Sequence, residues 1–227
     1  MAAGDTLSAR LARLAVSDLA DLYDRRRIVP PVLARELRFI GAPQRFAGPA
    51  FCVQGRKLDG AGWLPLTTGR DALYDGLADQ VPAGAVVVMD CGGYDDTAVF
   101  GGGTGLALKL RGCAGAIIDS AVRDVEELAA SGMPVLARAV SPIRFMGRLR
   151  ITAIDCPIEV RGLAGPVAVS PGDLVLADHD GAIVVSRELA AELIGEAEQA
   201  EANEARIKAD VLAGMSRLDA VKKHRKA

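Results

Sequence analysis

Residues 85–138 read AVVVMDCGGYDDTAVFGGGTGLALKLRGCAGAIIDSAVRDVEELAASGMPVLAR, and the pattern of this segment indicates the fold class. Its apolar runs predict three strands, which are residues 85–90, 114–119 and 134–138. The residues between them predict two helices, one after the glycines at 101–103 and one that begins near Asp124. Strands and helices that alternate at this spacing indicate crossover units with parallel strands, which are buried on both faces.

Shorter elements are expected on both sides of this segment. The stretch FAGPAFCVQ at residues 46–54 predicts a strand entered through a Gly-Pro turn, and residues 70–78 predict a helix. Thr6 and Ser17 are expected to cap two short N-terminal helices. After Pro142, turn residues separate four short strands, PIEV, VAV, LVLAD and AIVV. The fold class is therefore α/β, in which an α/β layer with an N-terminal helical cover meets a β-rich layer.

The C-terminal segment predicts a long helix with little apolar surface. Ser186 is expected to cap this helix, with Glu188 in its first turn. From Glu196 the chain reads EAEQAEANEARIKAD, and packing on its own core does not explain so polar a helix. Two interpretations stay open: a solvated helix with a frayed basic tail after residue 214, or an arm over residues 187–214 that contacts a neighbouring subunit.

Composition narrows the class of protein. The chain has 227 residues, of which 50% are hydrophobic, so it can bury a sizeable core within one domain. Its formal net charge is -2 with a pI near 5.8, which provides no basic field for nucleic acid. The four cysteines are scattered, which argues for reduced thiols and against structural zinc. No apolar run approaches the roughly 20 residues that span a bilayer, so we expect a cytoplasmic protein without a membrane partner.

Polar groups suited to a small anion follow two of the expected strands. Residues Gly101–Thr104 open a helix, where free backbone N–H groups and the helix dipole bind carboxylate or phosphate. Arg123 and Asp124 follow the next strand, where parallel α/β sheets place their ligand crevice. A guanidinium binds the oxygens of an oxo acid in a fork, and a carboxylate holds a hard cation such as magnesium. Taken alone, the glycines are better explained by a tight turn and the Arg–Asp pair by a surface ion pair, but their positions together predict one crevice.

Four other side chains are weaker candidates for chemistry. Lys57 follows an expected strand and could form a Schiff base, but a solvated lysine beside Arg56 explains it better. Cys91 lies beside two glycines but has no histidine near it in the sequence. His179 and His224 form no pattern with a serine, and His179 is expected in a hairpin turn.

The spacing around Arg123 resembles a known family. Gly102 and Arg123 are separated by twenty residues, and the run Arg123-Asp124-Val125-Glu126-Glu127 completes the pattern G-x20-R-D-x2-E/D. This pattern resembles the RraA-like/4-hydroxy-4-methyl-2-oxoglutarate aldolase family, and the similarity extends from about Asp18 to Gly214. The resemblance implies a single domain over residues 1–227 with an α/β/β/α swivelling-domain-like fold and central β layers. It also implies a homotrimer or homohexamer.

The resemblance further implies roles for individual residues. In the aldolase members, the counterpart of Asp124 holds Mg²⁺ or Mn²⁺, and the counterpart of Arg123 contacts the pyruvyl group. The backbone amides that match Gly101, Gly102, Gly103 and Thr104 receive the substrate carboxylate. A further family acid comes from the C-terminal helix of a neighbouring subunit, and Glu201 and Glu204 both match it in this chain.

Gly102 departs from the aldolase pattern. Aldolase members carry an acid there, whereas RraA proteins that regulate RNase E have glycine. Two functions therefore stay open: a metal-dependent lyase that forms pyruvate from small 2-oxo acids, and a non-catalytic regulator of an RNA-processing enzyme. Aldol cleavage and oxaloacetate decarboxylation both leave an enolate, which Arg123 and a metal on Asp124 would stabilise. Decarboxylation needs no base at a 4-hydroxyl, so Gly102 predicts that decarboxylation is the faster reaction and that Gly102→Asp raises cleavage.

Overall fold

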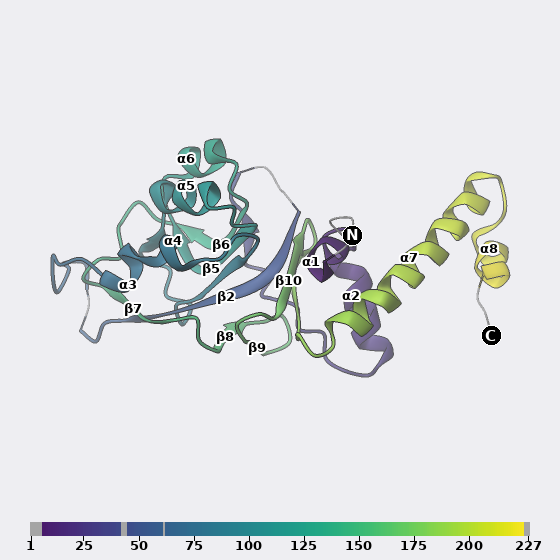
Figure 1. Ribbon diagram of the computed structural model, residues 1–227, viewed down its shortest axis with the longest axis horizontal. Helices are drawn as coiled ribbons and strands as arrows, with labels where there is room; N and C mark the ends of the chain where they lie inside the picture. The colour runs from purple at the N-terminus through teal and green to yellow at the C-terminus, as the bar shows by residue number, and fades with distance from the viewer. Residues whose placement is uncertain (1–5, 42–44, 61, 225–227) are drawn as a thin grey trace.

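Four layers of secondary structure, in the order α/β/β/α, make up the protein in a computed structural model that describes residues 6–41, 45–60 and 62–224 (Figure 1). The strands follow the order β1-β6-β5-β3-β2-β10-β11 through one curved sheet, and β8 pairs with β9 beside it. This arrangement agrees with the α/β/β/α fold that the resemblance implies. The layers are held together by three separate apolar cores.

The first β layer contains the strands predicted from the apolar runs. They are β2 (Phe46–Lys57), β3 (Val86–Asp90), β5 (Gly115–Val122) and β6 (Val135–Val140). The predicted parallel pairing is confirmed, because β3 pairs in parallel with β2 and β5, and β5 with β6. Two short strands escaped prediction, β1 (Arg38–Phe39) and β4 (Ala98–Phe100), because two or three residues carry no periodic signal.

Helices cover one face of these strands. They are α3 (Ala72–Asp75), α4 (Leu77–Gln80), α5 (Gly102–Leu110) and α6 (Val125–Ser131). Alternate strand residues such as Val87 and Ile118 pack against Leu108 and Leu128 of these helices. The single helix predicted over residues 70–78 is divided, because Gly76 ends α3 and begins α4.

The second β layer covers the other face of the parallel strands. It contains β8 (Ile158–Arg161), β9 (Pro166–Val169), β10 (Leu174–Asp178) and β11 (Gly181–Val185). The strand β7 (Leu149–Ile154), which was not predicted, pairs with the second half of β2 and packs on the side of the helices. The strand β2 belongs to both layers, since its first half pairs with β10 and residues 50–54 pair with β3. Val86 and Val88 of β3 pack against Val160 and Val184 between the layers.

The last layer is formed by α1 (Leu7–Leu11), α2 (Val16–Arg25) and the first part of α7 (Ala190–Leu212), which pack on β10 and β11. Thr6 caps α1 as predicted, because its side chain accepts a hydrogen bond from the Ala9 N–H at 3.2 Å. Ser17 does not cap α2. The helix begins one residue earlier, and the Val16 N–H donates to the buried Asp178 carboxylate of β10 at 2.9 Å.

The C-terminal helices form an arm that extends away from the sheet (Figure 1). Ser186 does not cap α7, because residues 186–189 form a turn and the helix begins at Ala190. The expectation of a frayed tail is wrong as far as His224, because α8 (Arg217–His224) folds back on α7. His224 Nε2 lies 2.7 Å from an Asp210 carboxylate oxygen. Residues 225–227 lie outside the described part. None of the described helices is long and apolar enough to cross a membrane.

Candidate functional site

A cavity of about 230 Å³ opens where β4 and β5 end. Its lining includes Gly101, Gly103 and Thr104 at the start of α5, and Arg123 and Asp124 after β5. The two groups of residues singled out in the sequence therefore share one wall. The rest of the lining is Tyr74, Ala98, Val99, Phe100, Arg144, Phe145 and Met146.

The first turn of α5 presents backbone donors to this cavity. Gly101 is the N-cap, with an extended backbone (φ -154°), and Gly102, Gly103 and Thr104 form the first turn. An α-helix provides no acceptor for the N–H groups of its first turn, so those of Gly103 and Thr104 are available to a ligand. Glycine at 101 leaves room for the Asp124 carboxylate, because a Cβ there would lie 2.8 Å from Asp124 Oδ2 and would displace it. The glycines thus do more than permit a turn.

Arg123 and Asp124 are held by the end of β5. The Arg123 N–H donates to the Phe100 carbonyl at 2.9 Å, which fixes the end of β5 to β4. Asp124 adopts a left-handed backbone (φ 55°, ψ 47°) as the N-cap of α6, and its side chain makes no cap hydrogen bond. Its Oδ2 instead lies 3.3 Å from Arg123 Nε and accepts from the Gly102 N–H at 3.3 Å. This conformation costs about 1–3 kcal/mol in a non-glycine residue, and it leaves the carboxylate beside the donors of α5.

Glu127 lies against Gly102. A Cβ on Gly102 would lie 2.7 Å from Glu127 Cβ, and the Glu127 carboxylate lies closer still to that position. The carboxylate thus occupies the space in which a side chain at position 102 would begin. No separate role was predicted for Glu127, although it is the last residue of the G-x20-R-D-x2-E/D pattern.

Two further lining residues, Tyr74 and Arg144, had no sequence signal. The Tyr74 hydroxyl lies 2.7 Å from Thr104 Oγ1, and its ring centroid lies 4.8 Å from that of Phe145. Burial raises the pKa of Tyr74 to about 12, so the hydroxyl keeps its proton. Arg144 is exposed, and within the described ranges no carboxylate forms an ion pair with it. The cavity therefore contains two arginines: Arg123, which pairs with Asp124, and Arg144, which has no carboxylate partner in the described structure.

The donor set suits a hard, hydrated cation better than zinc. Across residues 6–41, 45–60 and 62–224, no three His, Cys, Asp or Glu side chains gather as a complete metal cage. Asp124 and Glu127 nevertheless place two carboxylates at the start of α5. Mg²⁺ typically keeps several waters and binds through one or two carboxylates and the substrate, whereas zinc prefers nitrogen and sulfur.

The weaker candidates lie elsewhere. Lys57 is exposed, with its Nζ 4.8 Å from the centroid of the Tyr94 ring. Cys91 is buried, and burial raises its pKa far above the ordinary value, so it remains a thiol. His179 is exposed in the turn between β10 and β11, and His224 contacts the arm. We find no nucleophilic arrangement at these residues.

The acids predicted to complete a neighbour's site lie on the arm. Glu201 is exposed and Glu204 is half-buried, and both belong to α7. Figure 1 shows α7 at the other end of the molecule from α5 and α6. Neither acid can therefore reach the cavity of its own chain.

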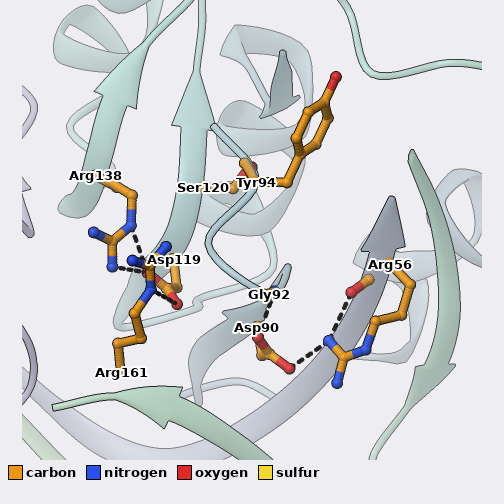
Figure 2. Close-up of polar contacts among 9 residues, drawn as sticks. Arg56, Asp90, Gly92, Tyr94, Asp119, Ser120, Arg138 and Arg161 are labelled. Atoms are coloured by element: carbon orange, nitrogen blue, oxygen red, sulfur yellow. Dashed lines mark hydrogen bonds and ion pairs between the residues drawn. The ribbon is translucent and has the colours of Figure 1, made fainter. Parts of the chain in front are cut away.

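A buried ionic cluster fixes the ends of β3 and β5 on the side of the second β layer (Figure 2). Asp119 accepts a hydrogen bond from Arg138 Nε at 2.8 Å, and Arg161 approaches its other oxygen at 3.9 Å. Asp90, the register partner of Asp119, accepts from Arg56 at 2.6 Å. Removing one member of such a pair leaves a buried charge unpaired, so loss of Arg138 or Asp119 would destabilise the sheet beside the site.

Comparisons with known proteins identify the same family as the motif. The sequence profile of the RraA-like family, described as Aldolase/RraA, matches residues 15–184. A curated protein of Burkholderia mallei (strain SAVP1), provisionally named as a 4-hydroxy-4-methyl-2-oxoglutarate aldolase, is 34% identical over 176 residues, covering 75% of this chain and 94% of its own.

Solved structures of similar proteins agree. A protein of Pseudomonas syringae pv. tomato str. DC3000 superposes with a TM-score of 0.81 at 25% identity, covering 96% of this chain and 93% of its own. Streptomyces coelicolor RraAS2, described as an unusual member of the RNase ES inhibitor RraA protein family, gives 0.73 at 26% identity, covering 89% and 96%. The RNA-processing inhibitor RraA from Thermus thermophilis gives 0.59 at 30% identity, covering 75% and 92%. The chain belongs to the RraA-like family, Aldolase/RraA.

Proposed function

We propose that the protein is a divalent-metal-dependent carbon–carbon lyase that forms pyruvate from small 2-oxo acids. The observation that carries the proposal is the shared wall of the cavity, where the amides of α5, the Arg123 guanidinium and the Asp124 carboxylate lie together. These are an anion site, a cation for a developing negative oxygen and a ligand for a hard metal. The name of the Burkholderia relative supports a lyase of this type.

Each group has a distinct task in this reaction. The N–H groups of Gly103 and Thr104 bind the substrate carboxylate, and Arg123 binds the 2-oxo oxygen and stabilises it as charge develops. Asp124 would hold Mg²⁺ or Mn²⁺. A bound divalent cation supplies Lewis-acid stabilisation of negative charge on the substrate oxygens. Because Asp124 also contacts the Gly102 N–H, the anion site and the metal ligand are fixed to each other.

The substrate class follows from the second arginine of the cavity. Arg144 belongs to the turn before β7, lines the same cavity as Arg123 and has no carboxylate partner in the described structure. One cation is required for the 2-oxo acid group, so the second favours a second carboxylate on the substrate. We therefore propose dicarboxylic 2-oxo acids, such as oxaloacetate or a 4-hydroxy-2-oxo diacid, as substrates.

Glu127 changes the interpretation of Gly102. The sequence predicts weak aldol cleavage because position 102 lacks an acid, but the carboxylate of Glu127 lies against this position. We propose that Glu127 supplies the missing acid from α6. It would then serve as the base for the 4-hydroxyl, and aldol cleavage would not depend on residue 102.

The test is pyruvate formation by the full-length protein. Purified protein is incubated with oxaloacetate and with 4-hydroxy-2-oxo diacids, in Mg²⁺, in Mn²⁺ and in chelator, and pyruvate is measured with lactate dehydrogenase. We expect metal-dependent turnover that Arg123→Lys weakens, because lysine cannot form the forked contact. Treatment with borohydride should trap no substrate adduct on Lys57 or another lysine. Absence of pyruvate from every substrate, or a trapped lysine adduct, would contradict the proposal.

A second function is supported by the names of two structural relatives, which are inhibitors of RNA processing or members of such a family. In this alternative the protein binds an RNA-processing enzyme and needs no chemistry of its own. The two functions are separated by Asp124→Asn. That variant should abolish turnover by a lyase, whereas a pure regulator should inhibit its target ribonuclease equally well with either residue.

We also propose that the arm formed by α7 and α8 contacts a neighbouring copy in a trimer or hexamer. Leu212 and Leu218 near its tip are 89% and 64% exposed, which is unfavourable for leucines in water. Light scattering measures the assembly directly. If the arm completes a neighbour's site, Arg123→Ala subunits mixed with subunits truncated after Gly195 should recover part of the activity that each has lost. A fully active monomer would exclude this arrangement.

A further inference from the structure

We propose that Tyr74 is the residue that protonates the three-carbon enolate, with Thr104 as the relay that restores its proton. The inference rests on the proposed lyase function and assigns the step that follows carbon–carbon cleavage. It arises from a hydroxyl pair in the cavity for which neither the motif nor the fold requires a role.

The position of Tyr74 is fixed from three sides. Asp71 caps α3 by accepting from the Tyr74 N–H at 3.2 Å, and its other carboxylate oxygen accepts from the Ile151 N–H of β7 at 2.8 Å. The ring packs edge-on against Phe145. The hydroxyl is therefore held against Thr104 by groups that do not themselves take part in the reaction.

Tyr74 also lies within the electrostatic reach of the reacting groups. The charges of Arg123 and Asp124 both act on its pKa, although burial is the larger influence and raises it to about 12. The hydroxyl is consequently protonated throughout the neutral range. A neutral phenol can protonate an enolate carbon, since a carbanion equivalent is a far stronger base than a phenolate.

The lining of the cavity contains few alternatives. Arginine does not release its guanidinium proton in proteins, which excludes Arg123 and Arg144 as donors. Asp124 is assigned to the metal as a carboxylate. Glu127 is not among the residues that line this cavity, and it receives no proton in oxaloacetate decarboxylation, so it is not the donor in that reaction. The other lining side chains in the described structure are apolar or glycine, which leaves the Tyr74 and Thr104 hydroxyls as the protein donors.

The step balances without any further reactant. When the bond to C3 breaks, carbon dioxide or the carbonyl product leaves and the electron pair stays with the pyruvyl fragment as its enolate. C3 then takes the proton of the Tyr74 hydroxyl. Thr104, whose hydroxyl lies 2.7 Å away, passes its proton to the phenolate oxygen while it accepts one from solvent at the cavity mouth, so no alkoxide forms. No oxidant or reductant takes part.

The experiment compares Tyr74→Phe with the wild type in three measurements on full-length, metal-loaded protein. The first is exchange of the pyruvate methyl protons in D₂O, followed by proton NMR. The second compares loss of oxaloacetate with appearance of pyruvate, because lactate dehydrogenase reduces the ketone and not the enol. The third is binding of oxalate, which tests the anion site without any proton transfer.

We expect Tyr74→Phe to slow methyl exchange by about 10²-fold or more, as for loss of a general acid, and to delay pyruvate after oxaloacetate loss. Oxalate should bind as tightly as in the wild type, because the amides of α5 and the ring packing are kept. Thr104→Val should slow exchange and Thr104→Ser should restore it. The matched control is Tyr94→Phe, since Tyr94 lies outside this cavity and its loss should change none of the three measurements.

The outcomes separate this inference from the function on which it rests. A wild type that neither exchanges pyruvate protons nor releases pyruvate overturns both. A wild type that does so, with a Tyr74→Phe variant that binds oxalate and exchanges at the wild-type rate, overturns the role of Tyr74 alone and assigns protonation to solvent. If Tyr74→Phe fails to fold, the Thr104→Val and Thr104→Ser pair decides: equal exchange by both overturns the relay and the donor that depends on it.

Discussion

Replacing Gly102 by alanine should destabilise the protein, although the same change at the adjacent Gly103 should not. A Cβ at 102 would lie 2.7 Å from Glu127 Cβ, whereas a Cβ at 103 meets nothing within 4 Å. Carbon atoms in contact normally lie about 3.5–4.0 Å apart, so α5 and α6 must separate by about 1 Å in Gly102→Ala. Both atoms are attached directly to helix backbones, and rotation of a side chain cannot relieve the overlap.

The change in the free energy of unfolding caused by Gly102→Ala follows from two opposing effects. Overpacking of this kind costs about 1–3 kcal/mol, and removing a glycine from a helix returns about 0.5–1 kcal/mol. Gly102→Ala should therefore lose about 1–2 kcal/mol, or about 2–8 °C in Tm for a chain of this size. Gly103→Ala has only the favourable effect and should match or exceed the wild type.

The same reasoning reverses the sequence-based expectation for Gly102→Asp. Aspartate at 102 must displace the Glu127 carboxylate, so we now expect the variant to lose cleavage activity. Glu127→Gln keeps the shape and removes the charge; it should lower aldol cleavage by about 10²–10⁴-fold with little change in Tm, if Glu127 is the base. Calorimetry gives the stabilities and the pyruvate assay gives the rates. A Gly102→Ala variant as stable and active as Gly103→Ala would refute the close approach of α5 and α6.

Three further outcomes follow from the site and the arm. Asp124→Asn, which tolerates the left-handed backbone, should abolish metal-dependent turnover and the increase in Tm caused by Mg²⁺ or Mn²⁺, as measured by activity and calorimetry. Arg144→Ala should raise KM for oxaloacetate by about 10–100-fold, the value of one charged hydrogen bond, without changing oxalate affinity. Hydrogen bonds from Lys223 and His224 lower the pKa of Asp210. This pairing therefore stabilises the packing of α8 at pH values above the ordinary aspartate pKa of 3.8, and the stabilisation is lost as the pH falls below that value. Amide hydrogen exchange in α8 should then accelerate at low pH, while exchange in β3 should not.

The parallel strands could be predicted from the sequence because both of their faces are buried, which requires apolar or small residues at nearly every position. Every residue of β3 and β5 is buried, and both strands consist of apolar and small residues except for the buried Asp90 and Asp119. The helix starts were less predictable. Ser17 has the right chemistry for a cap, but Asp178 reaches the start of α2 from β10, which is 162 residues away in the chain. Such a contact depends on the assembled layers and leaves no local signal.

The residues of the site also differ in whether a local sequence signal could predict them. Gly101–Thr104 and Arg123–Asp124 could be brought together in advance, because each follows a strand and parallel strands end at one edge of a sheet. Tyr74 and Arg144 could not. Tyr74 belongs to a helix of four residues, and Arg144 lies in the turn before β7, so their approach to the cavity depends on contacts with Thr104 and Ala98. No periodicity or spacing predicts such contacts.

Gly102 and Glu127 depend on each other, because a side chain at position 102 and the Glu127 side chain would occupy the same space. Gly102 and Gly105 lie three residues apart on the same face of α5, and a Cβ at either position would overlap a side chain of α6, Glu127 or Leu128. The left-handed backbone of Asp124 sets where α6 begins, and thus which of its residues meet α5. With the helices this close, an acid can project from α6 or from position 102, but both cannot occupy the same space. Glycine at 102 is therefore the condition for Glu127 to pack against the start of α5, so the lack of an acid at position 102 does not leave this end of the helix without a carboxylate.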